Sequence, residues 1–209
     1  MLLVALTGGI ATGKSVVAQV LGQLGCYIQE SDKLAHDLQA PGTRAWKDLV
    51  AHFGERILNP DKTINRRSLG SIVFADEKER DFLNGLIHPL VIAKKKELVQ
   101  KLQEEGRYKI FVSVAALTIE AGFTKFFDKI VVVHCDRVVQ LERLMERDSI
   151  GREEALSKIK SQMSTEDKIK HADYIIDTTG TLKQTLERAE QVYRNLMLDF
   201  ELKNTQTIG

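Results

Sequence analysis

The start of the sequence contains a pattern that binds phosphate groups. Residues 8–15 read GGIATGKS and fit G-x-x-x-x-G-K-S/T, with an apolar run before them. The glycines permit backbone turns that are closed to residues with a Cβ, so that successive N–H groups can converge on phosphate oxygens. Lys14 supplies a mobile positive charge for the outer phosphates, and the hydroxyl of Ser15 is a ligand for Mg²⁺. The residues expected to contact the nucleotide are Gly8, Gly9, Ala11, Thr12, Gly13, Lys14, Ser15 and Val16.

A second group of residues has the charge needed to hold a polyphosphate. Residues 140–148 read QLERLMERD and have helical spacing. On such a helix Arg143 and Arg147 lie four positions apart on one face, so their guanidinium groups could close over the phosphates, with Arg152 further along. The alternative is a solvated helix on which Glu and Arg side chains pair with each other. Beside a phosphate-binding loop, the favoured interpretation is a mobile basic lid.

Short apolar runs separated by helical patterns predict the elements that position these residues. The runs are Leu2–Thr7, Cys26–Glu30, Lys109–Val114, Lys129–Cys135 and Tyr174–Asp177. Continuous apolar strands that alternate with helices indicate an α/β fold, in which helices cover both faces of a parallel sheet. Sites in such open sheets lie at the carboxyl ends of the strands. The segments at these ends are the Gly8 loop, Ser31–Asp32, Glu120–Gly122 and the residues after Asp136.

Between residues 39 and 107 the alternation stops and helical patterns replace it. Pro89 is expected to end or kink the helix that contains Leu86, and Gly106 is expected to stop the helix that follows. The run Lys94–Lys96 is expected on the solvated face of that second helix. A helical insertion beside a sheet is a candidate substrate-binding region, with structural padding as the alternative.

Composition limits the remaining possibilities. The 209 residues are 43% hydrophobic and 28% charged, which is typical of a soluble globule of one domain with insertions. With 30 basic and 29 acidic side chains, the chain has no overall field that would attract nucleic acid. Cys26 and Cys135 lack C-x-x-C spacing, which predicts buried thiols in a reducing compartment. No basic leader and no membrane-spanning apolar run occurs, so we expect a cytoplasmic protein without a membrane partner. Residues 182–200 have the spacing of a packing helix.

Many of these residues resemble, in the same order, the landmarks of bacterial dephospho-coenzyme A kinase, a P-loop kinase family. The resemblance covers nearly the whole chain. Its most restrictive parts are the sequence I-H-P at residues 87–89 and the pattern Q-x-x-R-x-x-x-R-D at residues 140–148. The other matching segments are Gly8–Ser15, Asp32–His36, Arg66–Phe74, Leu83–Leu86, Glu120–Gly122, Gln162–Met163 and Ala172–Asp177.

The resemblance implies a fold, a domain organisation and a reaction. The fold is a P-loop kinase with a five-stranded parallel sheet flanked by helices, a helical substrate-binding insertion and a helical lid. Within a single domain, the nucleotide-binding core is expected at residues 1–38, 107–140 and 171–209, the coenzyme A-binding insertion at 39–106 and the lid at 141–170. The implied reaction transfers phosphate from ATP, with Mg²⁺, to the ribose 3′-hydroxyl of dephospho-coenzyme A. This is the last step of coenzyme A biosynthesis.

Phosphoryl transfer also needs a group that takes the proton of the attacking hydroxyl. Asp32 is expected to be this base, because it follows the second strand and ends a Glu-Ser-Asp triplet where the family usually shows D-A-D. Glu30 keeps the charge of the first acid of that triplet but has a longer side chain beside the magnesium. A helix-capping role is the alternative for Asp32.

The remaining expected site residues bind the two substrates. Lys14, Arg143 and Arg147 are assigned to the ATP phosphates and to the charge of the transition state. From the resemblance, Arg66 and His88 are expected to contact dephospho-coenzyme A. A hydrogen-bonded structural histidine is the alternative for His88.

Two segments depart from the family pattern. Residues 116–120 read ALTIE where the family tends to show P-L-L-F/V-E, so the proline that would stiffen the turn beneath the substrate is lost. Residues 177–180 read DTTG in place of D-N-x-G, so a contact from Asn near the nucleotide base is absent or is supplied by threonine. Neither change removes a charged catalytic group.

Two other functions are consistent with a phosphate-binding loop. A kinase for another small hydroxylated or nucleotide acceptor would share the loop, lid and sheet but would differ in the helical insertion. A non-catalytic nucleotide sensor or regulatory GTPase would need a guanine-reading N-K-x-D motif, which does not occur in the chain. The D-x-x-G at residues 177–180 also comes late in the chain for a GTPase.

Overall fold

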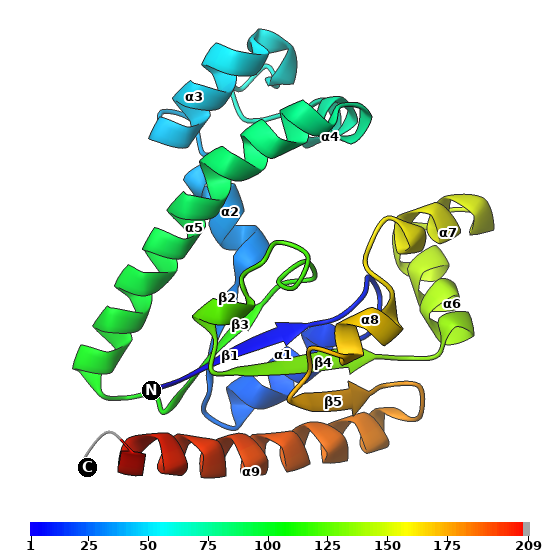
Figure 1. The fold of residues 1–209 in the computed structure, drawn as a ribbon. Helices are drawn as coiled ribbons and strands as arrows, with labels where there is room; N and C mark the ends of the chain where they lie inside the picture. Colours follow the sequence, from blue (N-terminus) through cyan, green and yellow to red (C-terminus); the bar gives the residue numbers. More distant parts are fainter. Residues whose placement is uncertain (207–209) are drawn as a thin grey trace. The chain divides into compact units, whose positions relative to one another are not determined.

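The computed structural model describes residues 1–206. The chain divides into two compact units (Figure 1). The first comprises residues 1–30 together with the chain from residue 105 onward, and the second comprises residues 31–104. The first unit contains the sheet and the second is helical.

The sheet of the first unit is five-stranded and entirely parallel, as predicted. Its strand order is β2-β3-β1-β4-β5, so β1 lies at the centre (Figure 1). The strands are β1 (Leu2–Thr7), β2 (Tyr27–Glu30), β3 (Ile110–Val114), β4 (Lys129–His134) and β5 (Tyr174–Asp177). Each lies within one residue of its predicted bounds at both ends, because each is a continuous apolar run that the sheet buries.

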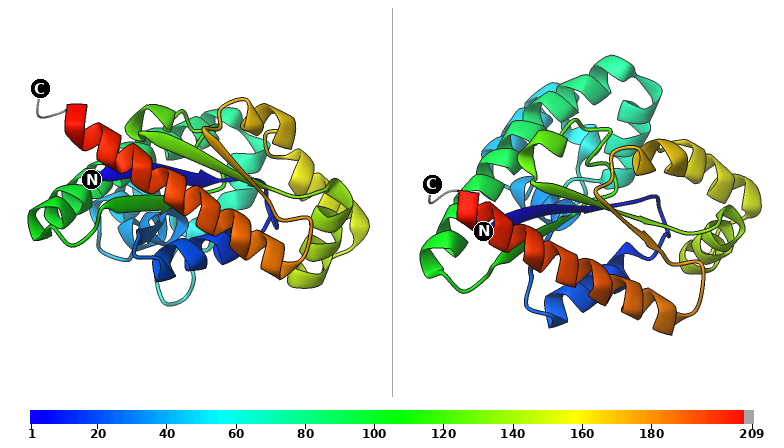
Figure 2. Two further views of the ribbon diagram at one scale, coloured as in Figure 1. Left: turned by 90° about the horizontal axis from the view of Figure 1, so that it is seen from below. Right: turned by 60° about the horizontal axis from the view of Figure 1, so that its bottom comes forward.

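Helices cover both faces of this sheet, as the apolar strands predict. The helices of this unit are α1 (Lys14–Gln23), α6 (Arg137–Asp148), α7 (Arg152–Lys160), α8 (Thr165–Ile169) and α9 (Leu182–Gln206), with a short 3₁₀ helix η2 (Thr124–Phe126). Of these, α6 and α7 pack on each other rather than on a face of the sheet. Val4 on β1 packs in one cluster with residues of α1 and α9, whereas the next residue, Ala5, packs in another with Ile169 of α8. Alternate side chains of one strand thus enter the two layers. Figure 2 shows α9 running along one side of the sheet.

The packing role expected for the last helix is confirmed along most of α9. Ala189, Val192 and Leu196 are buried in the cluster beneath the sheet. Leu182, at the start of the helix, differs because 63% of its surface is exposed. Both cysteines are buried free thiols, as expected.

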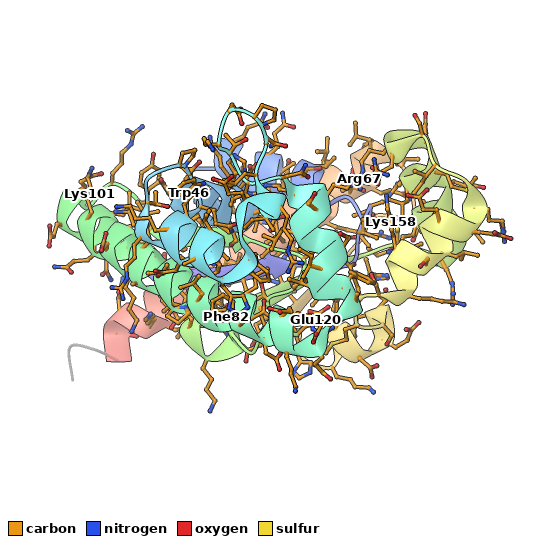
Figure 3. The ribbon with its side chains drawn as sticks, turned by 90° about the horizontal axis from the view of Figure 1, so that it is seen from above. Trp46, Arg67, Phe82, Lys101, Glu120 and Lys158 are labelled. Atoms are coloured by element: carbon orange, nitrogen blue, oxygen red, sulfur yellow. The ribbon has the colours of Figure 1, made fainter. Side chains whose placement is uncertain are left out.

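The second unit is built from helices around a core of its own. Its elements are α2 (Ser31–Leu38), α3 (Arg44–Phe53), the 3₁₀ helix η1 (Glu55–Ile57), α4 (Arg66–Ala75) and α5 (Glu77–Glu105). The side chains of Thr43 and Asn65 accept hydrogen bonds from backbone N–H groups in the first turns of α3 and α4 and so fix where these helices begin. Trp46 on α3 and Phe82 on α5, labelled in Figure 3, pack against the buried core of this unit.

The helix α5 differs from the sequence prediction. This helix is 29 residues long and contains Pro89, so the residues expected to form a second helix after the proline belong to the same helix. Proline removes one backbone hydrogen bond, but Ile87 and Val91 on either side of it are both buried in the unit's core. This packing favours continuation of the helix. Its end at Glu105, followed by Gly106 with φ of 65°, agrees with the predicted stop.

The prediction that residues 94–96 all lie on the solvated face of the helix is also partly wrong. Lys94 and Lys96 are exposed, but only 3% of the surface of Lys95 is accessible. Residues four apart share one side of a helix. Lys95 therefore continues the buried stripe of Val91 and Val99, which the charge of the run as a whole conceals.

Candidate active site

The phosphate-binding loop connects the central strand β1 to helix α1. Two of its glycines have positive φ, 149° at Gly8 and 88° at Gly13. A Cβ at Gly8 would also lie 2.1 Å from the carbonyl oxygen of Val133 on the neighbouring strand. Glycine is therefore required at position 8 on two independent grounds. Gly13 caps α1, so the positive end of the helix dipole points at this loop.

The lysine and the hydroxyl expected to serve the phosphates lie in the first turn of α1. Lys14 extends back over the loop, where its Nζ donates to the carbonyl oxygens of Gly8 at 2.9 Å and Gly9 at 2.7 Å. Ser15 is exposed beside it. The loop therefore holds a cation where it turns, and a phosphate oxygen could replace either carbonyl as the acceptor of the lysine.

Threonine side chains fix the other end of the loop. The hydroxyl of Thr12 donates to the carbonyl oxygen of Gly9 at 2.9 Å. Thr178, at the carboxyl end of β5, donates from its hydroxyl to the carbonyl oxygen of Thr12 at 2.8 Å. Both threonines are buried. A buried hydrogen-bonded pair of this kind holds the loop against the fifth strand.

Arg143 on α6 reaches the same threonine. Its guanidinium donates to the hydroxyl of Thr178 at 3.0 Å and to the carbonyl oxygen of Thr178 at 2.8 Å. The structure therefore brings together the phosphate-binding loop, the lid-entry arginine and the threonine that stands where the family usually has Asn. A cavity of about 250 Å³ opens between them; its lining residues are Gly13, Val16, Arg143, Thr178, Gly180, Leu182 and Thr185.

Sequence reasoning missed part of this cavity. Leu182 was expected only to pack, yet its side chain is exposed and lines the cavity. Thr185 gave no signal in the sequence, because a threonine on an amphipathic helix is common. Thr178 did give one, as a departure from the family pattern. Cys135 lies close to Arg143, but burial raises the pKa of its thiol, so it stays protonated rather than acting as a nucleophile.

Arg147 lies on the same helix as Arg143 but has different partners. Its Nε donates to the carboxylate of the neighbouring Asp148 at 2.8 Å, and 55% of its side chain is exposed. Lys158 on α7, labelled in Figure 3, also contacts Asp148, at 3.4 Å. These hydrogen bonds, that from Arg147 foremost, lower the pKa of Asp148. The structure places Arg143, but not Arg147, at the nucleotide cavity.

Asp32, the expected base, lies in the helical unit. It is exposed in the first turn of α2. Lys95 of α5 is an electrostatic neighbour: burial lowers the pKa of Lys95 to about 8, and the negative charge of Asp32 partly opposes this shift. Sequence analysis did not single out Lys95. A buried lysine beside an exposed carboxylate is a candidate site feature, because buried ionisable groups are rare outside functional sites and ion pairs.

The two expected substrate contacts also lie in the helical unit, on different helices. Arg66 is the first residue of α4, and its guanidinium contacts the ring of His36 on α2. His88 on α5 is partly buried, and this burial lowers the pKa of its imidazole. A lowered pKa keeps the ring of His88 neutral at pH 7, so that it can both donate and accept hydrogen bonds.

The loop after β3 is held by an ion pair whose cation is buried. Lys168 on α8 is fully buried, and its Nζ lies 2.5 Å from Oε1 of Glu120 and 2.8 Å from the carbonyl oxygen of Ala116. Thr7, at the end of β1, donates to the same carbonyl at 3.2 Å. Ala116 stands where the family tends to have proline. Side-chain hydrogen bonds therefore fix this loop where the family uses a rigid ring.

Neither a metal cluster nor a membrane segment is found within residues 1–206. No group of three His, Cys, Asp or Glu side chains in this range could hold a metal ion. No helix in the same range is long and apolar enough to cross a membrane.

Comparisons with known proteins agree with this geometry. A sequence model of the family described as dephospho-CoA kinase matches residues 2–184. The dephospho-CoA kinase of Halalkalibacterium halodurans is 41% identical over 184 residues, covering 88% of this chain and 91% of the relative. That of Geobacter metallireducens is 43% identical over 185 residues, covering 88% of this chain and 92% of the relative.

Solved structures extend the agreement to the fold. The dephospho-CoA kinase from Campylobacter jejuni superposes with a TM-score of 0.68 at 28% identity, covering 93% of this chain and 96% of that one. A shikimate kinase from Acinetobacter baumannii, at 16% identity and a TM-score of 0.54, shares the fold. Since the family model spans most of the sequence and relatives at about two-fifths identity cover nearly their full length, this chain belongs to the dephospho-CoA kinase family.

Proposed function

We propose that this chain transfers the γ-phosphoryl group of ATP to the ribose 3′-hydroxyl of dephospho-coenzyme A, forming ADP and coenzyme A. The observation that carries the proposal is the assembly of Lys14, Thr178 and Arg143 around one loop and cavity, in a chain of this family. The loop amides and Lys14 suit the phosphates of ATP, and the adjoining cavity suits its base and sugar.

The nucleotide-binding residues act mainly through charge. Gly8, Gly9, Ala11, Thr12, Gly13 and Val16 contribute the backbone of the cradle. Lys14 and Arg143 neutralise the charge that moves onto the β,γ-bridging oxygen as the bond to the γ-phosphorus breaks. Arg147 joins them when its part of the lid, within residues 141–170, closes on the nucleotide and gives up Asp148. Closure also excludes water, which would otherwise compete with the sugar hydroxyl as acceptor.

Mg²⁺ would be held by Ser15 together with phosphate oxygens. The hydroxyl of Ser15 is exposed beside Lys14, so an ion on the β- and γ-phosphates could reach it. Magnesium usually takes few ligands from protein and keeps phosphate oxygens and waters, so the lack of a three-residue cluster within residues 1–206 fits this use. The bound ion would supply further neutralisation of the phosphate charge.

The helical region 39–106 and the start of α2 serve the acceptor. Asp32 accepts the proton of the 3′-hydroxyl as its oxygen attacks the γ-phosphorus. The negative charge of Asp32 in turn favours the charged form of Lys95, against the burial that lowers the pKa of this lysine. Arg66 and His88 contact dephospho-coenzyme A, Arg66 through its positive charge and His88 through hydrogen bonds from a neutral ring.

The test is a measurement of ADP formation from ATP and Mg²⁺ with different acceptors. Dephospho-coenzyme A is expected to raise the rate far above that without acceptor, and nucleoside monophosphates are expected to leave it unchanged. Mass spectrometry of the product should show one added phosphate. A rate that responds to nucleoside monophosphates instead would reassign the acceptor, and ATP binding without any acceptor-dependent turnover would contradict catalysis.

A further inference from the structure

The phosphate-binding loop is held at a single residue, Ile10, by two glutamines that the proposed function does not use. The backbone N–H of Ile10 donates to Oε1 of Gln162 at 2.8 Å. The carbonyl oxygen of Ile10 accepts from Nε2 of Gln140, also at 2.8 Å. The donor and the acceptor of Ile10 are thus both engaged by side chains that lie more than a hundred residues away in sequence.

The two glutamines come from different parts of the region assigned to the lid and its entry. Gln140 lies on α6, three residues before Arg143, and is buried. Gln162 lies between α7 and α8, and the next residue, Met163, donates its backbone N–H to Glu120 at 3.2 Å. The chain next to Gln162 is therefore anchored to Glu120, which in turn pairs with the buried Lys168 on α8.

The loop is shaped to admit these side chains. A Cβ on Gly9 would lie 2.7 Å from Nε2 of Gln140, so this position is kept free of a side chain where the glutamine passes. Ile10 and Ala11 pack against a buried apolar cluster of Leu141 and Leu144 on α6 with Ala155 on α7. Apolar packing and directed hydrogen bonds thus act on the same turn of the loop.

The loop also contains a conformation that needs support. Ala11, the next residue, has a φ of 59°, in the left-handed region that disfavours residues with a Cβ. Such a residue persists where its surroundings fix it. The hydrogen bonds to Ile10 fix the peptides on both sides of this residue, the second of which leads into Ala11. They thereby define the direction from which the following amides approach a phosphate.

We propose that Gln140 and Gln162 are positioning residues of the ATP site, which clamp the backbone of Ile10 and hold the loop amides in their phosphate-binding arrangement. Neither side chain touches the reacting atoms. Because Gln140 shares α6 with Arg143, the clamp also fixes the helix that carries the lid-entry arginine relative to the loop. The inference rests on the proposed function only in that ATP is the nucleotide bound.

The two glutamines have opposite hydrogen-bonding roles, which gives a specific test. Gln140 must donate, so Gln140→Glu, which presents an oxygen to a carbonyl, should harm the loop more than the isosteric Gln140→Met. Gln162 must accept, so Gln162→Glu keeps the bond to the Ile10 N–H and Gln162→Met loses it. A role limited to filling space would give the same order of effects at both positions.

Three measurements follow these variants. ATP affinity, by calorimetry, should fall by about tenfold in Gln140→Met and Gln162→Met, the loss of one ordinary hydrogen bond. The KM for dephospho-coenzyme A should not change. The third measurement is amide hydrogen exchange of the protein without nucleotide, so that repulsion between ATP and a new carboxylate cannot affect the result. The Ile10 amide should be protected from exchange in Gln162→Glu and should exchange rapidly in Gln162→Met.

The controls separate the outcomes. Gln191→Met replaces an exposed glutamine on α9 and should leave both ATP affinity and Ile10 exchange unchanged. Thermal unfolding shows which variants fold. If the variants of the buried Gln140 fail to fold, the variants of the partly buried Gln162 still test the proposal. Unchanged ATP affinity and unchanged Ile10 exchange in Gln162→Met would overturn the clamp. Weakened ATP binding in a protein that never phosphorylates dephospho-coenzyme A would support the clamp and refute the proposed reaction.

Discussion

The carboxylate of Asp32 and the ammonium of Lys95 lie in the same compact unit, and the negative charge of Asp32 favours the charged form of Lys95. Asp32 is exposed on α2, and Lys95 is almost fully buried on α5. If Asp32 is the general base, Asp32→Asn should lower kcat by about 10²- to 10⁴-fold, because the amide cannot accept the proton of the attacking hydroxyl. ATP affinity should be retained, since the substitution is nearly isosteric and lies outside the phosphate-binding loop.

Steady-state kinetics with dephospho-coenzyme A, together with calorimetric titration of ATP, test this prediction. Asp37→Asn, an exposed acid further along α2, is the matched control and should have the activity of the unmodified protein. If kcat of Asp32→Asn stays within a few-fold of the value for the unmodified protein, Asp32 is not the general base.

Arg143 makes two directed hydrogen bonds to Thr178, which a lysine cannot reproduce. Lysine keeps the charge but loses the planar fork that contacts both the hydroxyl and the carbonyl oxygen of Thr178. Arg143→Lys is expected to lower kcat/KM for ATP by about 10³-fold or more if this arginine stabilises the transition state. Single-turnover kinetics measure the effect on the chemical step.

Arg194→Lys, on the exposed side of α9, serves as the control for an arginine replaced at the surface. Arg147→Lys tests the lid separately, because Arg147 has its own partner, Asp148. If Arg147→Lys leaves kcat/KM for ATP unchanged, Arg147 does not act in the site. The same result for Arg143→Lys would exclude Arg143.

The sequence was most informative where chemistry requires a fixed spacing. The loop at residues 8–15 and the position of Arg143 follow from such spacing, and the structure brings both to one cavity. The burial of Lys95 could not be predicted from the sequence, because a lysine between two exposed lysines has no local sign of burial. Its burial depends on which helices pack on α5, which is a tertiary property.

At the scale of elements, continuous apolar runs located all five strands, because a parallel sheet buries both faces of each strand. Helix α5 was harder. Proline disfavours a helix interior locally, but the buried stripe through Ile87, Val91 and Val99 outweighs the loss of one hydrogen bond. Packing of a long apolar stripe, which involves residues far apart in sequence, decided the outcome.

The loop after β3 gives a prediction at this scale. Lys168 on α8 is fully buried, and its charge is balanced by Glu120 and by the carbonyl oxygen of Ala116. Glu120→Gln should therefore lower the free energy of unfolding by about 3 kcal/mol, because removal of one partner leaves a buried charge unpaired. Urea denaturation measures the change.

A substitution of Lys170, two residues after Lys168, provides the control. Lys170→Met removes an exposed pair with Asp167 and should leave the free energy of unfolding almost unchanged. Lys168→Met in the Glu120→Gln background removes the unpaired ammonium and should recover part of the lost stability. If Glu120→Gln were as mild as Lys170→Met, the pair would not fix this loop.

At the scale of the whole molecule, chemistry is divided between two units that differ in construction. The first unit has a sheet, with the phosphate-binding loop after β1 and Arg143 on α6, and the second is helical with Asp32, Arg66 and His88 on three of its helices. Sheet and helical core each have their own buried apolar cluster. The sequence predicted a helical insertion at residues 39–106 because the period of the apolar residues changes along the chain, and the helical unit of the structure comprises residues 31–104.

The stability of the helical unit should depend on pH through Lys95. Burial lowers the pKa of Lys95 from 10.5 to about 8, which corresponds to about 3 kcal/mol of unfavourable free energy for its charged form. Below pH 8 the lysine is charged in both the folded and the unfolded chain, so this cost is fully present. Between pH 8 and about 10.5 the folded protein binds fewer protons than the unfolded one, so stability contributed by this group rises with pH.

Lys95→Met is therefore expected to be more stable than the unmodified protein at pH 7, by up to about 3 kcal/mol, because methionine fills the buried stripe without a charge. The advantage should shrink as pH rises past 8 and vanish above about pH 10.5, where Lys95 is neutral in both states. Chemical denaturation of both proteins at several pH values measures the difference. Lys96→Met, an exposed neighbour, should show a small difference that does not vary over this range. A stability difference for Lys95→Met that stays constant from pH 7 to about 10.5 would mean that Lys95 is not held charged at a cost in the folded protein.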